Sequence, residues 1–264
     1  MLGLIEKSLA DSTRVAYRQA WEDFCMSGAR RRDSTSTGIR QRREDVERFI
    51  MEKIRNGLSS VTIAAKLSGI GFYGKIFWGY EPSAGELGRR ILQGWSKEQK
   101  RKPNEREPIT IPRLFKILNK LPQVCYTQFE ERLFHLCMVW LFFGAFRISE
   151  LLGSASFAAM RVQDVAIQDN MLHLCLRRSK TDQKGKGAVV RLKGFGGFMC
   201  PVAAWFSFLQ VGGGTGEFIF CHENSFALSA GQVLAVLRKL LVLLGEKASC
   251  FGTHSFRIGA ATEA

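Results

Sequence analysis

A charged segment with two prolines divides this chain of 264 residues into two parts. The stretch SKEQKRKPNEREPIT, from Ser96 to Thr110, contains one apolar residue and alternating charges. This composition is typical of an exposed linker, because it offers nothing to bury in a core. We therefore expect a first domain at 1–95, a linker at 96–109 and a second domain at 110–264, in line with the one to two domains that this length allows.

The first part, 1–95, shows only helical periodicity. Ser12 or Thr13 is expected to cap its first helix, Asn56-Gly57 to end its second, and Ser59 or Ser60 to begin its third. The apolar residues that define three helices and suggest a fourth are Tyr17, Trp21 and Phe24; Val46, Phe49, Ile50 and Ile54; Ile63, Leu67 and Ile70; and Leu87, Ile91 and Trp95. Amphipathic helices joined by short connections predict a small bundle.

The second part mixes helices with a change of period. Thr110 is expected to cap a helix, and a long apolar helix follows over 129–143. Leu172, Leu174 and Leu176 then alternate with polar residues, which predicts a strand. The runs 162–167 and 189–192 are its expected partners, with a turn at Asp169-Asn170 and a second turn over 180–187. Helices resume at 202–209 and 232–244, so the predicted class is mainly α with a small antiparallel β-meander (α+β).

The charge of the chain favours a polyanionic partner. Lys and Arg number 38 against 24 Asp and Glu, which gives a net charge of +14. A basic domain of this kind is typical of nucleic-acid binding, although many soluble proteins are basic without such a role. The longest apolar run is too short to span a membrane, and no signal peptide is visible. The seven cysteines form no C-x-x-C pair, so we expect a reducing compartment, no disulfide framework and no metal site.

Three separate motifs carry the candidate chemistry. His254 and Arg257 lie three residues apart at an expected helix start capped by Thr253, where both can donate to one phosphate; an ordinary helix start with a solvated arginine is the alternative. Arg147 directly follows the long apolar helix and needs an anion or a carboxylate, such as Glu150, if it is buried. Lys180 lies at the tip of the expected hairpin. The G-x-G-x-x-G run at 69–74 follows a helix, so close packing explains it better than nucleotide binding.

Taken together, the segments GAFRISELL, RRSKTDQKGKG and HSFRIGAAT resemble the tyrosine recombinases (the phage-integrase family), in particular members from eukaryotic mobile elements. The resemblance spans nearly the whole chain. It implies a helical core-binding domain at 1–95 and a catalytic domain over about 108–264. It also implies double-stranded DNA as the partner, a reaction without a metal or cofactor, and assembly as a homo-oligomer on DNA.

The resemblance assigns a role to each motif. Arg147 and Arg257 would clamp the scissile phosphate, His254 would donate a hydrogen bond or manage a proton, and Lys180 would be the general acid. The basic linker residues, Lys100, Arg101, Lys102 and Arg106, would follow backbone phosphates, which gives affinity without sequence information. Lys100-Arg101-Lys102-Pro103 also fits a nuclear import signal, so we expect the nucleus and otherwise the cytoplasm.

One departure from the family pattern concerns the nucleophile. The family's tyrosine follows the His-x-x-Arg motif, whereas this sequence stops seven residues after Arg257 and has tyrosines only at 17, 73, 80 and 126. The expectation is therefore a sequence truncated before its nucleophile, which should not cleave DNA. A recombinase represented by an incomplete sequence, a non-catalytic DNA-binding regulator or relic, and a basic interaction module without DNA stay open as alternatives.

Overall fold

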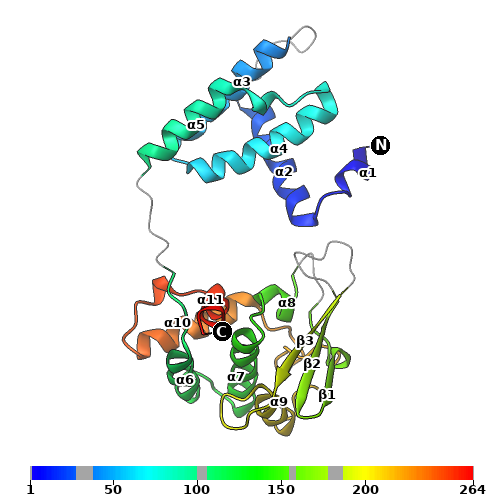
Figure 1. The fold of residues 1–264 in the computed structure, drawn as a ribbon, viewed down its shortest axis with the longest axis vertical. Coiled ribbons are helices and arrows are strands. Elements are labelled where there is room, and N and C mark those ends of the chain that lie inside the picture. Colours follow the sequence, from blue (N-terminus) through cyan, green and yellow to red (C-terminus); the bar gives the residue numbers. More distant parts are fainter. Residues whose placement is uncertain (1, 28–37, 100–105, 155–158, 178–186, 264) are drawn as a thin grey trace. The chain divides into compact units, whose positions relative to one another are not determined.

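The computed structural model describes residues 2–27, 38–99, 106–154, 159–177 and 187–263. The chain divides into two compact units, Met1–Pro103 and Asn104–Ala264. Figure 1 shows that the first unit is built from helices and the second from helices around a small sheet. Lys100, Arg101, Lys102 and Lys180, four of the expected DNA contacts, lie outside the described residues.

The first unit is a helical bundle, as its periodicity predicts. Phe24, Phe49, Ile50, Ile63 and Ile70 form its buried centre. Its helices are α1 (Leu2–Glu6), α2 (Asp11–Met26), α3 (Ile39–Arg55), α4 (Ser60–Trp78) and α5 (Glu86–Glu98), with a 3₁₀ turn at Pro82–Ala84. These elements account for all four predicted helices and add the short α1.

The predicted helix ends are correct in two places and wrong in one. Ser59 caps α4, because its side chain accepts a hydrogen bond from the Thr62 N–H, and Gly57 follows α3 with φ +75°. The predicted cap of the first helix at Ser12 or Thr13 is wrong. Helix α2 begins at Asp11, with Ala10 at the N-cap, so both hydroxyl residues lie inside its first turn.

The glycines of the G-x-G-x-x-G run serve packing within this unit. Gly69 lies inside α4, where a Cβ would approach the Tyr17 Cα of α2 to 2.9 Å. At Gly74 a Cβ would collide with the ring of Pro82. Glycine therefore permits close contact between α4 and its neighbours, as predicted. The run lies within α4, however, and does not follow a helix.

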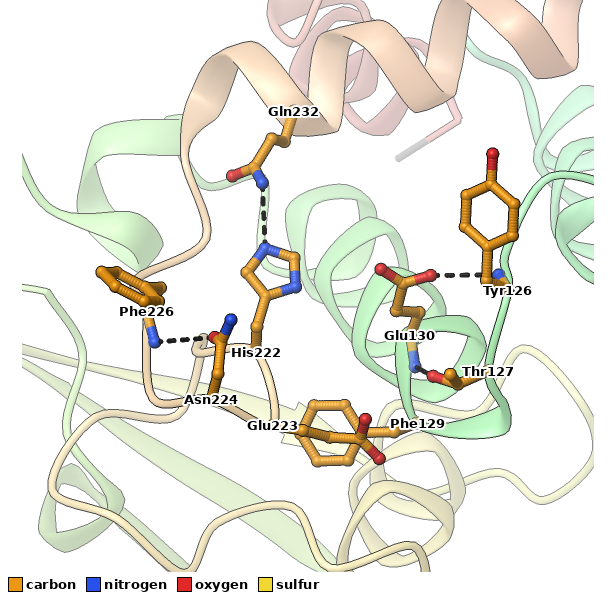
Figure 2. A pocket seen from close by; sticks show the side chains of 9 residues that line it. All are labelled: Tyr126, Thr127, Phe129, Glu130, His222, Glu223, Asn224, Phe226 and Gln232. Atoms are coloured by element: carbon orange, nitrogen blue, oxygen red, sulfur yellow. Dashed lines mark hydrogen bonds between the residues drawn. The ribbon is translucent and has the colours of Figure 1, made fainter.

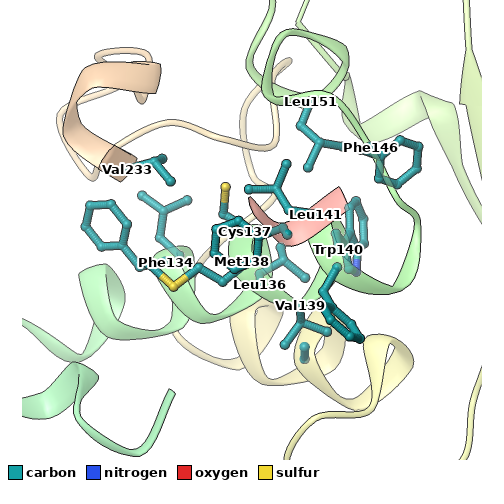
Figure 3. Packing of buried hydrophobic residues seen from close by; sticks show 14 of the residues in the cluster. Phe134, Leu136, Cys137, Met138, Val139, Trp140, Leu141, Phe146, Leu151 and Val233 are labelled. Carbon is teal, nitrogen blue, oxygen red and sulfur yellow. The ribbon is translucent and has the colours of Figure 1, made fainter. Parts of the chain in front are cut away.

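The second unit surrounds one apolar helix, α7 (Gln128–Phe143), whose residues from Leu133 to Phe142 are all buried. Figure 3 shows buried side chains of this core, with Trp140 from α7 itself and Phe146 and Leu151 from the segment that follows it. The Trp140 Nε1–H donates to the carbonyl of Pro201 at 3.3 Å. The other helices are α6 (Ile111–Asn119), α8 (Ile148–Leu152), α9 (Pro201–Gln210), α10 (Ala230–Leu243) and α11 (His254–Thr262), with 3₁₀ turns at Leu121–Gln123, Val162–Asp164 and Ala248–Cys250.

The sheet is an antiparallel meander in the order β1-β2-β3. Its strands are β1 (Val165–Gln168), β2 (Met171–Leu176) and β3 (Ala188–Lys193), and Leu172 pairs with Ile167 on one side and with Leu192 on the other. The predicted turn is confirmed, since Asp169 and Asn170 both have positive φ, at 50° and 57°.

The first predicted strand, 162–167, is wrong in its first half. Val162–Asp164 forms a 3₁₀ turn. The carboxylate of Asp164 accepts a hydrogen bond from the Arg161 N–H at 3.0 Å, and this bond closes the chain into a turn before β1 begins.

The described residues contain no helix long and apolar enough to cross a membrane. Within the same residues, no group of three or more His, Cys, Asp or Glu side chains has an arrangement suited to a metal ion. All seven cysteines are free thiols.

Candidate phosphate-binding site

Arg147 occupies the N-cap of α8, directly after the turn that ends α7. Its guanidinium Nη1 donates to Glu150 Oε1 at 2.9 Å, and its backbone N–H donates to Glu150 Oε2 at 2.8 Å. The Glu150 side chain is 6% exposed and that of Arg147 is 31% exposed. The carboxylate partner that a buried arginine would need is thus present. This ion pair holds one nitrogen of the guanidinium, while the arginine side chain keeps exposed surface.

Arg257 reaches the same turn from α11. Its Nη1 donates to the backbone carbonyl of Ala145 at 3.0 Å, a contact between residues 112 positions apart in sequence. Because Ala145 lies two residues before Arg147, this bond brings the two arginines to one turn of backbone. Within the described part of the chain, no carboxylate forms an ion pair with Arg257, so none of these residues neutralises its positive charge.

Helix α11 is fixed in place by close backbone contacts. Ser255 and Phe256 are fully buried, and the Ser255 carbonyl accepts a hydrogen bond from the Ile109 N–H at 3.0 Å. One turn further on, Gly259 lies so close to Ile109 that a Cβ would be 1.8 Å from its carbonyl oxygen. The segment that enters the second unit therefore holds the helix that carries Arg257.

The predicted cap at Thr253 is only half correct. Thr253 lies at the N-cap of α11, but its side chain makes no capping hydrogen bond. Instead the Ser255 hydroxyl accepts a hydrogen bond from the Gly252 N–H at 3.1 Å, so a buried serine stabilises the turn before the helix. The same correction applies to Thr110, whose side chain makes no capping bond at α6.

His254 begins α11 and is exposed to solvent, three residues before Arg257 on the same helix. Of the four linker residues predicted to follow phosphates, Arg106 alone is described, and it is exposed. The structure thus brings Arg147 and Arg257 to one turn and places His254 on the helix of Arg257. Two guanidinium groups and one carboxylate, which pairs with Arg147, leave a net positive charge that suits a phosphate.

The tyrosine closest in sequence to this site, Tyr126, lies at the other end of α7. It precedes the helix and is 93% exposed, whereas Arg147 follows the helix. The sixteen residues of α7 span about 24 Å at 1.5 Å per residue. Tyr126 therefore lies far from the two arginines within this unit.

Ala145 is a residue of this site that no pattern in the sequence had indicated. Its φ of 47° lies in the left-handed region, which costs a residue with a Cβ about 1 kcal/mol or more. This conformation turns its carbonyl toward Arg257 and continues the chain into Arg147.

We expect Ala145→Gly to preserve this turn and to leave the free energy of unfolding unchanged or raise it by up to about 1 kcal/mol, since glycine adopts positive φ without strain but loses more entropy on folding. Ala145→Val is expected to lower the free energy of unfolding by more than about 1 kcal/mol, because a β-branched residue is poorly tolerated at positive φ. Urea unfolding followed by circular dichroism measures both. A glycine variant less stable than the valine variant would contradict this description of the turn.

No protein-family model matches the sequence, and no curated protein matches it. Solved structures do match. A lambda integrase (75–356) dimer bound to a COC' core site is 17% identical, with 98% of this chain and 84% of that chain covered and a TM-score of 0.62. XerH site-specific recombinase bound to palindromic difH substrate is 14% identical, with 95% of this chain and 68% of that chain covered and a TM-score of 0.64. The Tn1549 transposon integrase with circular intermediate DNA is 16% identical, with 96% of this chain and 81% of that chain covered and a TM-score of 0.59.

These similarities establish the fold. The chain has the architecture of the tyrosine recombinase catalytic domain, mainly helical with a three-stranded antiparallel sheet, and the predicted fold class is confirmed. The structural neighbours are recombinases and integrases in complex with DNA.

Proposed function

We propose that this chain binds double-stranded DNA as a protein of the tyrosine recombinase family, with a role in DNA recombination or integration. The observation that carries the proposal is the meeting of Arg147 and Arg257 at the Ala145 turn. Two guanidinium groups held in this way can donate several charge-assisted hydrogen bonds to one phosphate. In phosphoryl transfer, positioning and charge stabilisation of this kind supply most of the catalysis.

The other candidate DNA contacts have proposed roles around this pair of arginines, which we call the clamp. His254 donates a hydrogen bond to the same phosphate from the start of α11, and Lys180 is the residue that would protonate the leaving oxygen if a nucleophile were supplied. The linker residues, Lys100, Arg101, Lys102 and Arg106, follow neighbouring phosphates. The net charge of +14 supports this arrangement, since it attracts the chain to any duplex.

The proposed activity of the 264 residues by themselves is binding without cleavage. Tyr126 is the second unit's own tyrosine, and α7 separates it from Arg147. On duplexes selected from a random pool for tight binding, we expect no protein–DNA complex that survives SDS. Such a complex would contradict this part of the proposal. It would also exclude the alternative function, a non-catalytic DNA-binding regulator.

The experiment that tests the proposal is a salt titration of duplex binding, followed by fluorescence anisotropy. We expect Arg147→Ala and Arg257→Ala each to weaken binding and to reduce the slope of log K against log salt by up to about 0.9, the value for complete loss of one phosphate contact. Arg147→Lys and Arg257→Lys keep the charge but lose the planar donor geometry, so they should restore binding only in part.

Arg238→Ala, on the exposed side of α10, is the control for loss of one positive charge and should change the slope less. Circular dichroism verifies that each variant is folded, since Arg147→Ala removes the ion-pair partner of the buried Glu150. If neither alanine variant of the clamp changes the affinity, the two arginines do not hold DNA. If the unmodified chain binds no duplex at low salt, a basic interaction module becomes the function to test.

We propose further that the protein belongs to a eukaryotic mobile element, works in the nucleus and assembles as a homo-oligomer on DNA. The segments GAFRISELL, RRSKTDQKGKG and HSFRIGAAT support the first statement, and Lys100-Arg101-Lys102-Pro103 supports the second. Replacing these three basic residues with alanine in a fluorescent fusion should move it from the nucleus to the cytoplasm.

A further inference from the structure

A pocket of about 510 Å³ opens at the start of α7, the end of this helix remote from Arg147. Figure 2 shows its lining, which comes from the segment before and within the first turn of α7, from the loop at 222–226 and from the start of α10. The lining includes the aromatic rings of Tyr126 and Phe226, the carboxylates of Glu130 and Glu223, and the side chains of His222 and Gln232. The proposed DNA contacts use none of them.

Two aromatic side chains at this pocket are exposed to an unusual degree. Tyr126 is 93% exposed and Phe226 is 74% exposed. Neither ring contributes to the core of the unit, so folding does not account for their position. Exposed aromatic rings beside a concave surface are typical of a binding site, because a ligand that covers them removes apolar surface from water.

The imidazole of His222 is held in one orientation by a chain of hydrogen bonds. Gln232 Oε1 accepts from the backbone N–H of Ser229 at 2.8 Å and from its hydroxyl at 2.9 Å. The Gln232 amide nitrogen therefore faces His222 and donates to its Nε2 at 3.0 Å. In the neutral ring, the proton is then on Nδ1. Figure 2 shows this second nitrogen on the side of the ring that faces Glu130.

The lining carries acceptors and negative charge. Glu130 Oε2 accepts from the Tyr126 backbone N–H at 3.0 Å. Its Oε1, and both oxygens of Glu223, have no donor among the residues that the structure describes. No lysine or arginine lines the pocket. Two carboxylates without a lysine or arginine beside them give this pocket a negative charge on a chain whose net charge is +14, so it attracts cations where most of the surface repels them.

We propose that this pocket binds an alkylguanidinium group, as carried by an arginine side chain or a small guanidine. A guanidinium is planar and can stack on the Tyr126 or Phe226 ring. Its N–H groups pair with carboxylate oxygens in a fixed geometry that a single ammonium does not match. Arginine is therefore favoured over lysine. This inference is independent of the proposed DNA-binding function.

The test uses the 264-residue chain with 3-fluorotyrosine at its four tyrosines. The ¹⁹F resonance of residue 126 is assigned from the Tyr126→Phe variant. N-acetylarginine amide should shift this resonance in a saturable way, and N-acetyllysine amide should bind more weakly. N-acetylcitrulline amide, which has nearly the same shape but no charge, should not bind. Tighter binding of agmatine than of N-acetylarginine amide identifies a free guanidine as the ligand, and the reverse order identifies an arginine within a peptide.

Charge-neutral variants of the pocket provide the control. We expect Glu223→Gln and Glu130→Gln to weaken binding of N-acetylarginine amide about tenfold, whereas Glu98→Gln, on the exposed side of α5, should leave it unchanged. Glu223 makes no hydrogen bond within the described residues, so its variant should fold even if Glu130→Gln perturbs α7. Duplex binding should be the same in all three. Equal shifts from the citrulline and arginine amides, or an unchanged affinity in Glu223→Gln, would overturn the proposal.

Discussion

Replacing Gly259 with alanine is expected to lower the free energy of unfolding of the second unit by about 3 kcal/mol, at the upper end of what overpacking costs. The added Cβ would lie 1.8 Å from the carbonyl oxygen of Ile109 and 2.7 Å from its carbonyl carbon. Both atoms belong to the backbone, so no side-chain rotation relieves the collision. Helix α11 must move away from Ile109, and the hydrogen bond from the Ile109 N–H to the Ser255 carbonyl is strained or lost.

The same change should weaken DNA binding, because α11 carries His254 and Arg257. Gly231→Ala is the matched control. This glycine also lies in a helix of the second unit, where a Cβ would meet only the Ser229 hydroxyl at 3.8 Å, so its replacement should leave stability within about 1 kcal/mol. Chemical unfolding followed by circular dichroism measures both variants. Equal stability of the two would show that Ile109 does not pack on α11 in this way.

Acidification should destabilise the second unit through His135. This histidine is 3% exposed within α7, and neither ring nitrogen has a hydrogen-bond partner within the described residues. Burial lowers the pKa of His135 to about 4, and the nearby Arg132 acts in the same direction. The backbone of Phe198 acts in the opposite direction, but no hydrogen bond of acceptable geometry joins it to the ring.

The sign of the pH effect depends on whether the folded or the unfolded chain binds the proton. Between pH 6.5 and about 4, the unfolded chain protonates this histidine and the folded chain does not, so stability falls as the pH falls through this window. The full effect is about 3 kcal/mol, at 1.36 kcal/mol per pKa unit. His135→Met, which fills a similar volume without a titratable group, should remove this part of the pH dependence.

His173→Gln provides the comparison, because it replaces a histidine that lies half-buried on β2 of the same unit. The measurement is the free energy of unfolding from urea titrations at several values between pH 4 and 7. If His135→Met retains the slope of the unmodified chain in this range, other groups cause the acid sensitivity.

Local patterns predicted most of the secondary structure in this chain. The alternation at Leu172, Leu174 and Leu176 identified β2, and Asp169-Asn170 identified its turn, because each signal lies within a few residues. The helix caps at Ser12, Thr13 and Thr253 were less predictable. Several hydroxyl residues compete near each helix start, and the tertiary contacts of Ser255 decide which of them near α11 makes a hydrogen bond.

The candidate site could be predicted only in part. Arg147 was identified from its place after an apolar helix, and its possible partner Glu150 lies within one turn of it. The bond from Arg257 to the Ala145 carbonyl joins residues 112 positions apart, and no local pattern reports such a contact. Ala145 also has an ordinary side chain, so its positive φ had no sequence signal such as glycine or asparagine would give.

The most direct test of the central claim is a double-mutant cycle on duplex binding with Arg147→Ala, Arg257→Ala and the combined variant. If both guanidinium groups hold one phosphate at the Ala145 turn, each arginine contributes most when the other is present. Removing the second arginine from a chain that already lacks the first should then reduce the binding free energy much less than removing it from the unmodified chain. The cycle should show a coupling energy above about 0.5 kcal/mol. Strictly additive losses would place the two arginines on separate phosphates, and unchanged affinity in all three variants would contradict the clamp altogether.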